Sequence, residues 1–484
     1  MSELLNLEPK ALWKHFDNIC SIPHPSKHEE KIVAALVEFA KANNIEYKLD
    51  EVGNVIMRKP ATPGMENRKG VILQAHCDMV PQKNNDTKHD FLTDPILPRI
   101  EGEWVKATGT TLGADNGIGV AAALAVLEDK NLVHGPVEAL ITIDEETGMT
   151  GAFGLKAGEL NGDILLNLDS ETEGELYVGC AGGIDATITF DYKEEAFDSA
   201  YKAFALSIKG LKGGHSGMDI ILQRGNANKI LFRILKALEK VEVRVCDING
   251  GSLRNAIPRE AFCTIALPAT KVEEAKQIIA NITEIVKNEL SAVEPEILIA
   301  IEETTVPATF IDKDTMARVI RTIYACPNGI YRMSDSMENL VETSSNLAIV
   351  KSENGVIKAC ALLRSSVDTA KEDFAEMMAS VVELAGGNIE FAGGYPGWKP
   401  NMESPILNTM QTTYQKMFGR TPKVMAIHAG LECGLLGGVY KNWDMISFGP
   451  TIQNPHSPDE RVNIPSVKLF WDYLVETLKN VPQK

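Results

Sequence analysis

The chain has 484 residues, which is longer than a single hydrophobic core usually serves, so we expect two domains. Hydrophobic residues make up 44% and charged residues 24% of the sequence, which are ordinary proportions for a globular protein. The formal net charge of -18, from 48 basic and 66 acidic residues, argues against nucleic acid or anionic lipid as a partner.

The eight cysteines are dispersed, without a C-x-x-C pair or the dense spacing of a disulfide framework. Reduced thiols in a cytoplasm are therefore the simplest interpretation. Residues 1–5 do not begin a basic and then apolar leader, and no run reaches the roughly 18 apolar residues that a membrane span needs. We expect a cytoplasmic protein that has no membrane segment.

Helical spacing of apolar residues predicts helices over 8–20 and 28–42, and alternation around a glycine predicts a hairpin over 47–59. A short apolar strand over 71–75 then ends in His76 and Asp78. An imidazole and a carboxylate two residues apart suit a metal ligand and the group that orients it. A structural histidine with a turn-capping aspartate is the alternative.

A glycine-rich stretch over 109–117 precedes an alanine-rich helix predicted for 118–129, and Asp115 lies near the start of that helix. The stretch lacks the Lys-Ser/Thr pair of a phosphate-binding loop and follows no clear strand, so it is weak as a nucleotide site. Asp115 is a candidate ligand, with helix capping as the alternative.

The apolar run over 140–143 ends in Asp144, Glu145 and Glu146, which indicates a buried strand that delivers carboxylates to its carboxyl end. Open α/β sheets place their chemistry at that edge, and neighbouring acids repel unless a cation or proton offsets their charge. A second buried run, over 163–168, ends in Asp169. For the first run, a solvated acidic turn remains the alternative.

From about residue 185 the pattern changes to an α+β insertion, which contains two similar alternations of strands and helices. Its glycine loop 210–217 carries His215, where core packing is not expected, although many loop histidines are only surface residues. Asn255 and Arg364 are candidates for gripping a peptide or its carboxylate, with surface polar positions as the alternative.

The α/β pattern returns after about residue 395, with helices predicted over 405–418 and 466–480 and strands over 423–427 and 444–448. His456 lies between two prolines in the loop 454–460, so its orientation is fixed at low entropic cost, as suits a metal ligand.

The candidates for one metal site are therefore two imidazoles and three carboxylates. They suit a pair of divalent ions such as zinc, bridged by a carboxylate at the roughly 3.5 to 4 Å separation of two-metal hydrolases. No serine elbow, catalytic Cys-His signature or lysine cofactor motif competes with them. The five residues are His76, Asp115, Glu146, Asp169 and His456.

Six motifs, spread in order over almost the whole chain, resemble those of the M20 metallopeptidase family. They are QAHCDMV at 74–80, TLGADNG at 111–117, DEETG at 144–148, NLDS at 167–170, GGHSG at 213–217 and PHSP at 455–458.

The resemblance implies that His76 and Asp169 hold one metal, Glu146 and His456 hold the other, and Asp115 bridges them. It also implies roles for other residues. Glu145 would be the general base, Asp78 would orient His76, and the lid residue His215 would reach the scissile carbonyl oxygen, with looser substrate contacts from Asn255, Arg364, His428 and Glu432.

The fold implied is α/β: a di-metal aminopeptidase-like catalytic domain, with a mixed sheet flanked by helices, over 1–186 and 392–484. An inserted α+β lid domain with a duplicated appearance would occupy 187–391. The activity implied is metal-dependent hydrolysis of dipeptides, of the Xaa-His type and broader, with β-Ala-His as a candidate substrate. Zinc would be the native metal, with manganese or cobalt as substitutes, and a homodimer is a candidate assembly. The alternatives are an M20 deacylase, a tripeptide aminopeptidase or a non-catalytic metal-binding homologue.

Overall fold

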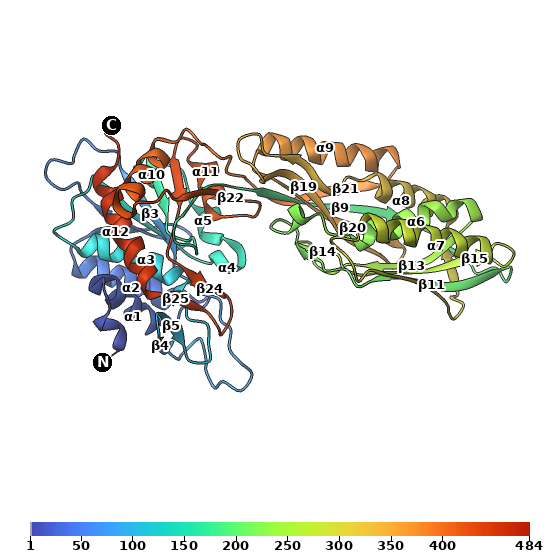
Figure 1. Ribbon diagram of the computed structural model, residues 1–484, viewed down its shortest axis with the longest axis horizontal. Helices are drawn as coiled ribbons and strands as arrows, with labels where there is room; N and C mark the ends of the chain where they lie inside the picture. Colours follow the sequence, from blue (N-terminus) through green and yellow to red (C-terminus); the bar gives the residue numbers. More distant parts are fainter. Residues whose placement is uncertain (1) are drawn as a thin grey trace. The chain divides into compact units, whose positions relative to one another are not determined.

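The computed structural model describes residues 2–484, and the chain divides into two compact units. The first unit contains Met1–Gly179, Pro400–Ala426 and Leu431–Lys484, and the second contains Cys180–Lys399 and Ile427–Gly430. The first unit is therefore discontinuous in sequence, because most of the second is inserted into it. In Figure 1 the red helices α10 (Pro405–Phe418) and α12 (Ile464–Asn480) pack beside each other, in the same unit as the blue N-terminal elements.

An eight-stranded mixed sheet organises the first unit. Its central strands run parallel, whereas the hairpin at one edge and the strand that follows β23 pair antiparallel. The antiparallel pair at the edge confirms the hairpin predicted for 47–59. In sheet order the strands are β1 (Glu46–Leu49), β2 (Val55–Lys59), β6 (Val137–Thr142), β3 (Val71–His76), β7 (Ile164–Asn167), β23 (Asp444–Ser447), β8 (Glu175–Cys180) and β22 (Lys423–Ile427).

The three central strands are buried along their whole length, as parallel strands covered on both faces usually are. Their register aligns His76 of β3 with Thr142 of β6, and Gln74 of β3 with Asn167 of β7. The carboxyl ends of β3, β6 and β7 therefore meet at one edge of the sheet.

Helices pack around this sheet, and the alanine-rich α3 is buried from Asn116 to Leu127. A small four-stranded sheet also belongs to the first unit, in the order β24 (Ile452–Gln453), β25 (Arg461–Asn463), β5 (Trp104–Ala107) and β4 (Pro98–Glu101). The helices other than α10 and α12 are η1 (Glu3–Asn6), α1 (Lys10–Cys20), α2 (Glu30–Ala42), α3 (Ala114–Glu128), α4 (Glu145–Gly148), α5 (Thr150–Gly154) and α11 (Glu432–Val439).

The second unit is built on a nine-stranded antiparallel sheet. Eight of its strands follow in the order β16 (Leu298–Glu303), β11 (Tyr201–Lys209), β15 (Ala261–Pro268), β13 (Arg244–Gly250), β19 (Val341–Glu353), β20 (Val356–Ser365), β9 (Gly182–Asp191) and β21 (Asn388–Tyr395), and β18 (Gly329–Met333) pairs with β19. Two short pairs, β10 (Glu194–Ala196) with β17 (Thr309–Ile311) and β12 (Gly214–His215) with β14 (Ala256–Ile257), complete the strands.

One hydrophobic core joins this sheet to its helices, and it includes Phe204 of β11, Phe232 of α6 and Phe374 of α9. The sequence predicted two similar α+β halves, and in the structure both contribute strands to the same sheet; a duplication stays a prediction. The helices are η2 (Ile220–Leu222), α6 (Ala227–Leu238), η3 (Glu239–Val241), α7 (Val272–Glu289), α8 (Lys313–Ala325) and α9 (Asp368–Leu384).

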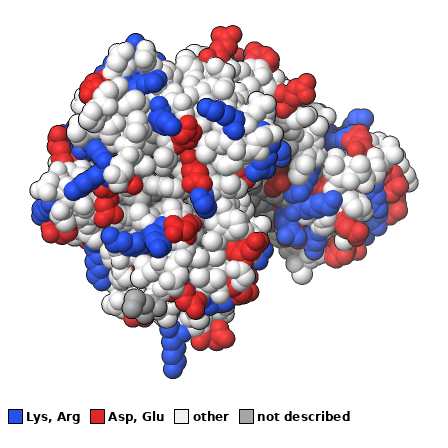
Figure 2. Space-filling model, turned by 60° about the vertical axis from the view of Figure 1, so that its left-hand side comes forward, with Lys and Arg blue, Asp and Glu red and all other residues white. Residues whose placement is uncertain are grey.

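The surface mixes both signs of charge. On the face drawn in Figure 2, basic and acidic side chains are interspersed rather than gathered by sign. Among residues 2–484, no helix combines the length and the apolar character needed to cross a bilayer.

Candidate metal centre

The residues singled out from the sequence in the first unit meet at the carboxyl edge of the central strands. His76 is the last residue of β3, Glu145 and Glu146 begin the short helix α4 just after β6, and Asp169 follows β7. Because β3, β6 and β7 are parallel neighbours, their loops open on the same side of the sheet. Asp115 in the first turn of α3 and His456, in the loop between β24 and β25, complete the cluster.

His76 lies between two carboxylates. Its Nε2 is 3.2 Å from Oδ1 of Asp115 and 3.3 Å from Oδ1 of Asp169, and its side chain is 1% exposed. A single ring nitrogen carries at most one proton, so as a hydrogen-bond donor it does not fully satisfy two carboxylate oxygens. A cation shared by all three atoms would satisfy them better. These three residues form the first candidate ligand set.

His456 has a matching arrangement on the other side of Asp115. Its Nε2 is 3.0 Å from Oε2 of Glu146 and 3.3 Å from Oδ2 of Asp115. The backbone of His456 adopts a left-handed φ of 58°, an uncommon conformation for a residue other than glycine. Asp115, Glu146 and His456 form the second candidate ligand set, and Asp115 belongs to both sets because each of its oxygens faces a different histidine.

The electrostatics of the cluster fit a divalent cation. Burial raises the pKa of Asp169 to about 7, with Asp115 and Glu146 adding to the rise although His76 opposes it. Hydrogen bonds to Asp115 and Glu146 raise the pKa of His456 to about 11, against the effect of burial. Both raised pKa values reflect acidic side chains crowded together, an arrangement that a bound cation would stabilise.

Oε1 of Glu146 also suits metal binding, because it is buried and accepts no hydrogen bond from any residue between 2 and 484. Two imidazole nitrogens and three carboxylates are a donor set that zinc and similar first-row ions accept. The residues present therefore fit a pair of divalent ions, with Asp115 as the shared ligand.

Asp78 fixes several parts of this centre at once. Its Oδ1 lies 3.3 Å from Nδ1 of His76 and accepts a 3.0 Å hydrogen bond from the backbone N–H of Glu145. Its Oδ2 accepts from the N–H of Glu146 at 3.3 Å and from the hydroxyl of Ser26 at 2.7 Å. Burial opposes ionisation of Asp78, but His76 and these donors lower its pKa to about 2. The carboxylate therefore orients the His76 ring and the start of α4 together.

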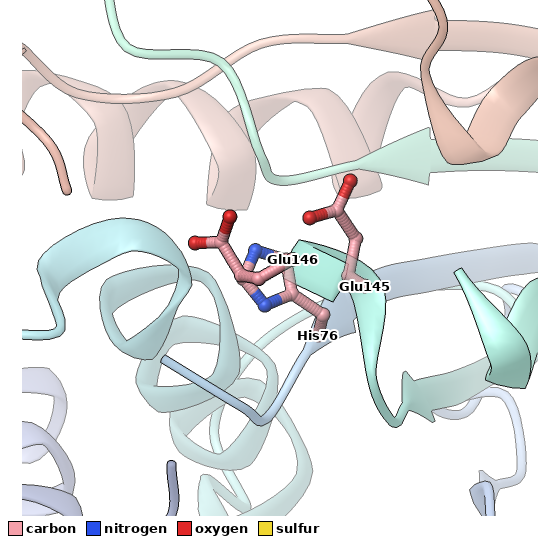
Figure 3. Close-up of side chains that lie close together, drawn as sticks. All are labelled: His76, Glu145 and Glu146. Atoms are coloured by element: carbon pink, nitrogen blue, oxygen red, sulfur yellow. The ribbon is translucent and has the colours of Figure 1, made fainter. Parts of the chain in front are cut away.

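Glu145 and Glu146 point in different directions from α4, as Figure 3 shows beside the ring of His76. The sequence predicted these acids at the end of an extended strand, but β6 stops at Thr142 and Asp144 takes a left-handed φ of 51°. Neighbouring residues in the helical turn that follows diverge by about 100°. Burial, with smaller contributions from Asp169, Glu432 and Glu146, raises the pKa of Glu145 well above its ordinary value, although His76 opposes the rise.

Glu432 also belongs to the first unit, at the start of α11. Its Oε2 accepts hydrogen bonds from Gln74 at 2.6 Å and Thr142 at 2.9 Å, while its Oε1 is buried without such a partner in the described part of the chain. Burial and the nearby Asp169, opposed by His76, raise the pKa of Glu432 to about 7. Its assignment to substrate contact stays a prediction.

The remaining predicted residues belong to the second unit, where two histidines are neutral. Nδ1 of His215 accepts backbone N–H groups from Gly217 at 3.2 Å and Met218 at 3.0 Å, so its Nε2 carries the proton and is a donor. Burial, with Arg364 nearby, lowers the pKa of His215 and takes that of His428 down to about 3.

Arg364 is 5% exposed, and its Nη1 donates to the hydroxyl of Tyr395 at 2.9 Å. Its other nitrogens reach the hydroxyl of Ser216 only at 3.4 and 3.5 Å, which leaves them weakly bonded. Asn255 is exposed next to β14, and its backbone carbonyl accepts the N–H of Ser216. The roles of these second-unit residues in substrate binding stay predictions.

Sequence reasoning missed Glu460, whose carboxylate contacts the loop that carries Asp115. The only available signal was its position four residues after His456, and an acid in a proline-containing loop has many ordinary explanations. Ser26, which donates to Asp78, was also missed, because its partner is 52 residues away in the chain.

Comparison with known proteins gives four findings. A family model described as peptidase family M20/M25/M40 matches residues 72–480. The chain is 51% identical over 485 residues, covering the whole of both sequences, to the cytosol non-specific dipeptidase of Escherichia coli (strain K12). It matches the crystal structure of aminoacylhistidine dipeptidase from Vibrio alginolyticus with a TM-score of 0.96 and 53% identity, covering 100% of this chain and 99% of that one. Aminopeptidase PepT from Bacillus cereus shares the fold, with a TM-score of 0.62 at 17% identity and coverage of 98% and 99%.

Proposed function

The chain belongs to peptidase family M20/M25/M40, and from that premise we propose that it is a two-metal dipeptidase of the cytoplasm. The observation that carries the proposal is Asp115, each of whose oxygens faces the Nε2 of a different histidine. The relatives in Escherichia coli and Vibrio alginolyticus, matched over nearly their full length, are both named as dipeptidases. A homodimer stays an expectation from the sequence.

The ligand sets are proposed as His76 with Asp169, and Glu146 with His456, around the shared Asp115. When bound, a pair of divalent ions supplies an activated water and polarises the carbonyl of the scissile peptide bond. Zinc fits these nitrogen and carboxylate donors, and manganese or cobalt are the expected substitutes.

Glu145 is proposed to move the proton. Its carboxylate, which Figure 3 shows diverging from that of Glu146, takes a proton from the attacking water and then gives it to the departing amine nitrogen. Asp78 keeps the His76 ring and the backbone of Glu145 in place during this transfer, since it contacts both. One residue can thus be the base while its neighbour is a ligand.

The second unit is proposed to supply substrate recognition. Arg364 has weakly bonded guanidinium nitrogens that suit a peptide carboxylate, and Asn255 and His428 are further candidates in this unit. Glu432 is a candidate from the first unit. The Nε2 proton of His215 is proposed to stabilise negative charge on the scissile carbonyl oxygen.

A substrate panel tests the proposed activity. We expect the metal-loaded protein to hydrolyse dipeptides, including Xaa-His substrates and β-Ala-His, with higher kcat/KM than tripeptides or N-acyl amino acids. The comparison is made at one pH and one metal concentration, with product quantified by chromatography. A preference for tripeptides or acylated amino acids would instead assign the chain to one of the other activities expected from the sequence.

Replacement of His215 tests the proposed donor. Because the residue belongs to the second unit, whereas every candidate metal ligand lies in the first, His215→Ala should lower kcat and leave metal content unchanged. Loss of a single oxyanion donor typically lowers kcat by about 10²- to 10³-fold. Metal analysis and steady-state kinetics on the same preparation measure both quantities, and an unchanged kcat would rule the role out.

A further inference from the structure

The side chain of Glu460 accepts hydrogen bonds from the backbone of the loop that carries Asp115. Its side chain is 2% exposed, and both carboxylate oxygens accept two hydrogen bonds each. Oε2 accepts the N–H groups of Leu112 at 2.7 Å and Gly113 at 3.0 Å, and Oε1 accepts those of Ala114 at 2.7 Å and Asp115 at 3.2 Å. Four consecutive backbone donors thus converge on one buried carboxylate.

The local backbone explains why an acceptor belongs there. Gly113 has a left-handed φ of 73°, and Asp115 and Asn116 have non-helical φ and ψ values inside the assigned range of α3, so the regular helix begins only after them. The N–H groups of residues 112–115 therefore precede the regular helix and need an acceptor outside it. The carboxylate of Glu460, about 345 residues away in the sequence, accepts all four.

Glu460 itself lies in the loop that carries His456, a member of the second candidate ligand set. Glu460 lies four residues after His456, and its backbone N–H donates to the carbonyl of Ser457 at 2.9 Å. Strand β25 begins at the next residue and pairs with β5, which anchors this end of the loop in the small sheet. A single side chain therefore joins the segment of Asp115 to the segment of His456.

We propose that Glu460 is a positioning residue for the metal centre, which fixes the separation of Asp115 and His456 before any ion binds. The inference rests on the proposed two-metal function. It explains how two ligands that are 341 residues apart in the chain keep Nε2 of His456 within 3.3 Å of Oδ2 of Asp115. Partners of this kind, one step removed from a metal, typically change metal affinity or activity by about 10- to 100-fold when replaced.

Glutamine is an informative replacement because it keeps the size of the side chain but has only one acceptor oxygen. In Glu460→Gln the amide NH₂ must face two backbone N–H groups, so two of the four hydrogen bonds are lost and like donors oppose each other. Glu460→Asp keeps both acceptors on a side chain shorter by one methylene. We therefore expect a graded series, with the aspartate variant between the wild type and the glutamine variant.

Glu138 provides a matched control in the same unit. It is 6% exposed, and its Oε2 accepts the backbone N–H groups of Asn161 at 2.7 Å and Gly162 at 2.8 Å. It lies near the start of β6, at the opposite end of that strand from α4. Glu138→Gln should lower the melting temperature without changing metal affinity.

The experiment measures Zn²⁺ affinity by competition with a chromophoric chelator, and the visible absorption spectrum of the Co²⁺-loaded protein. We expect Glu460→Gln to bind zinc about 10- to 100-fold more weakly with an altered cobalt spectrum, Glu460→Asp to show a smaller loss, and Glu138→Gln to match the wild type. If the glutamine variant does not fold, the aspartate variant decides by the same two measurements.

Wild-type zinc affinity and an unchanged cobalt spectrum in a folded Glu460 variant would overturn the proposal, even if its melting temperature falls. Equal loss of affinity in Glu138→Gln would also overturn it, because the effect would then be general destabilisation. A wild-type protein that binds no metal would instead overturn the proposed function together with this inference, so the two failures are distinguishable.

Discussion

Glu145→Gln should retain near-normal metal content while losing at least about 10²- to 10⁴-fold in kcat, the range typical of removing a general base. The amide is nearly isosteric with the acid, and neither three-residue ligand set that contains Asp115 includes Glu145. The backbone N–H of residue 145 remains free to donate to Asp78, so the start of α4 keeps its anchor. Metal analysis by mass spectrometry and kcat for a good dipeptide, on one preparation, measure both effects.

Glu146→Gln is the matched comparison, because it changes the adjacent residue in the same way. Oε2 of Glu146 lies 3.0 Å from Nε2 of His456, so we expect weaker binding of one metal and partial recovery of activity in excess metal. Comparison of the two glutamine variants distinguishes a role in proton transfer from a role in metal binding. Metal loss in the Glu145 variant with retention in the Glu146 variant would mean that the two roles are reversed.

Removal of metal should abolish dipeptide hydrolysis, and zinc, manganese or cobalt should restore it. Without a cation, the three carboxylates around His76 and His456 are balanced only by protons, as the raised pKa of Asp169 indicates. Dialysis against a chelator, followed by titration of each metal against activity, measures the effect. Full activity in protein verified as metal-free would contradict the proposed function.

Metal removal should also lower the melting temperature. A ligand that binds only the folded state stabilises it, by about 2.7 kcal/mol when its concentration is 100 times its dissociation constant. Differential scanning calorimetry of the metal-free and metal-loaded protein measures this shift. An equal melting temperature in both forms would show that the cluster does not bind the added ion.

The sequence predicted much of the fold because hydrophobic spacing is local. The strand expected over 71–75 is β3 (Val71–His76), and the helix expected over 405–418 is α10 with those same limits. The mixed α/β class with an inserted α+β domain is confirmed, as is membership of the M20 family. The domain boundaries expected at 186/187 and 391/392 stay predictions.

The candidate site was predictable in its residue types but not in its contacts. His76 and Asp169 could be read as polar residues after buried strands, yet no spacing shows that each oxygen of Asp115 faces a different histidine. The turn at Asp144 was missed because a left-handed residue other than glycine has weak sequence signals. Glu460 was missed because all four of its backbone partners lie about 345 residues away.

The discontinuity of the first unit has a consequence for the order of biosynthesis. A ribosome makes His76, Asp115 and Asp169 early, then more than 200 residues of the second unit, and only afterwards the segment that contains His456 and Glu460. A nascent chain therefore holds one candidate ligand set long before the other exists, and the Asp115 loop stays without its carboxylate cap. The second candidate ligand set is thus completed only when this late segment has been translated, and a chain that lacks the segment keeps four of the five candidate ligands but not His456.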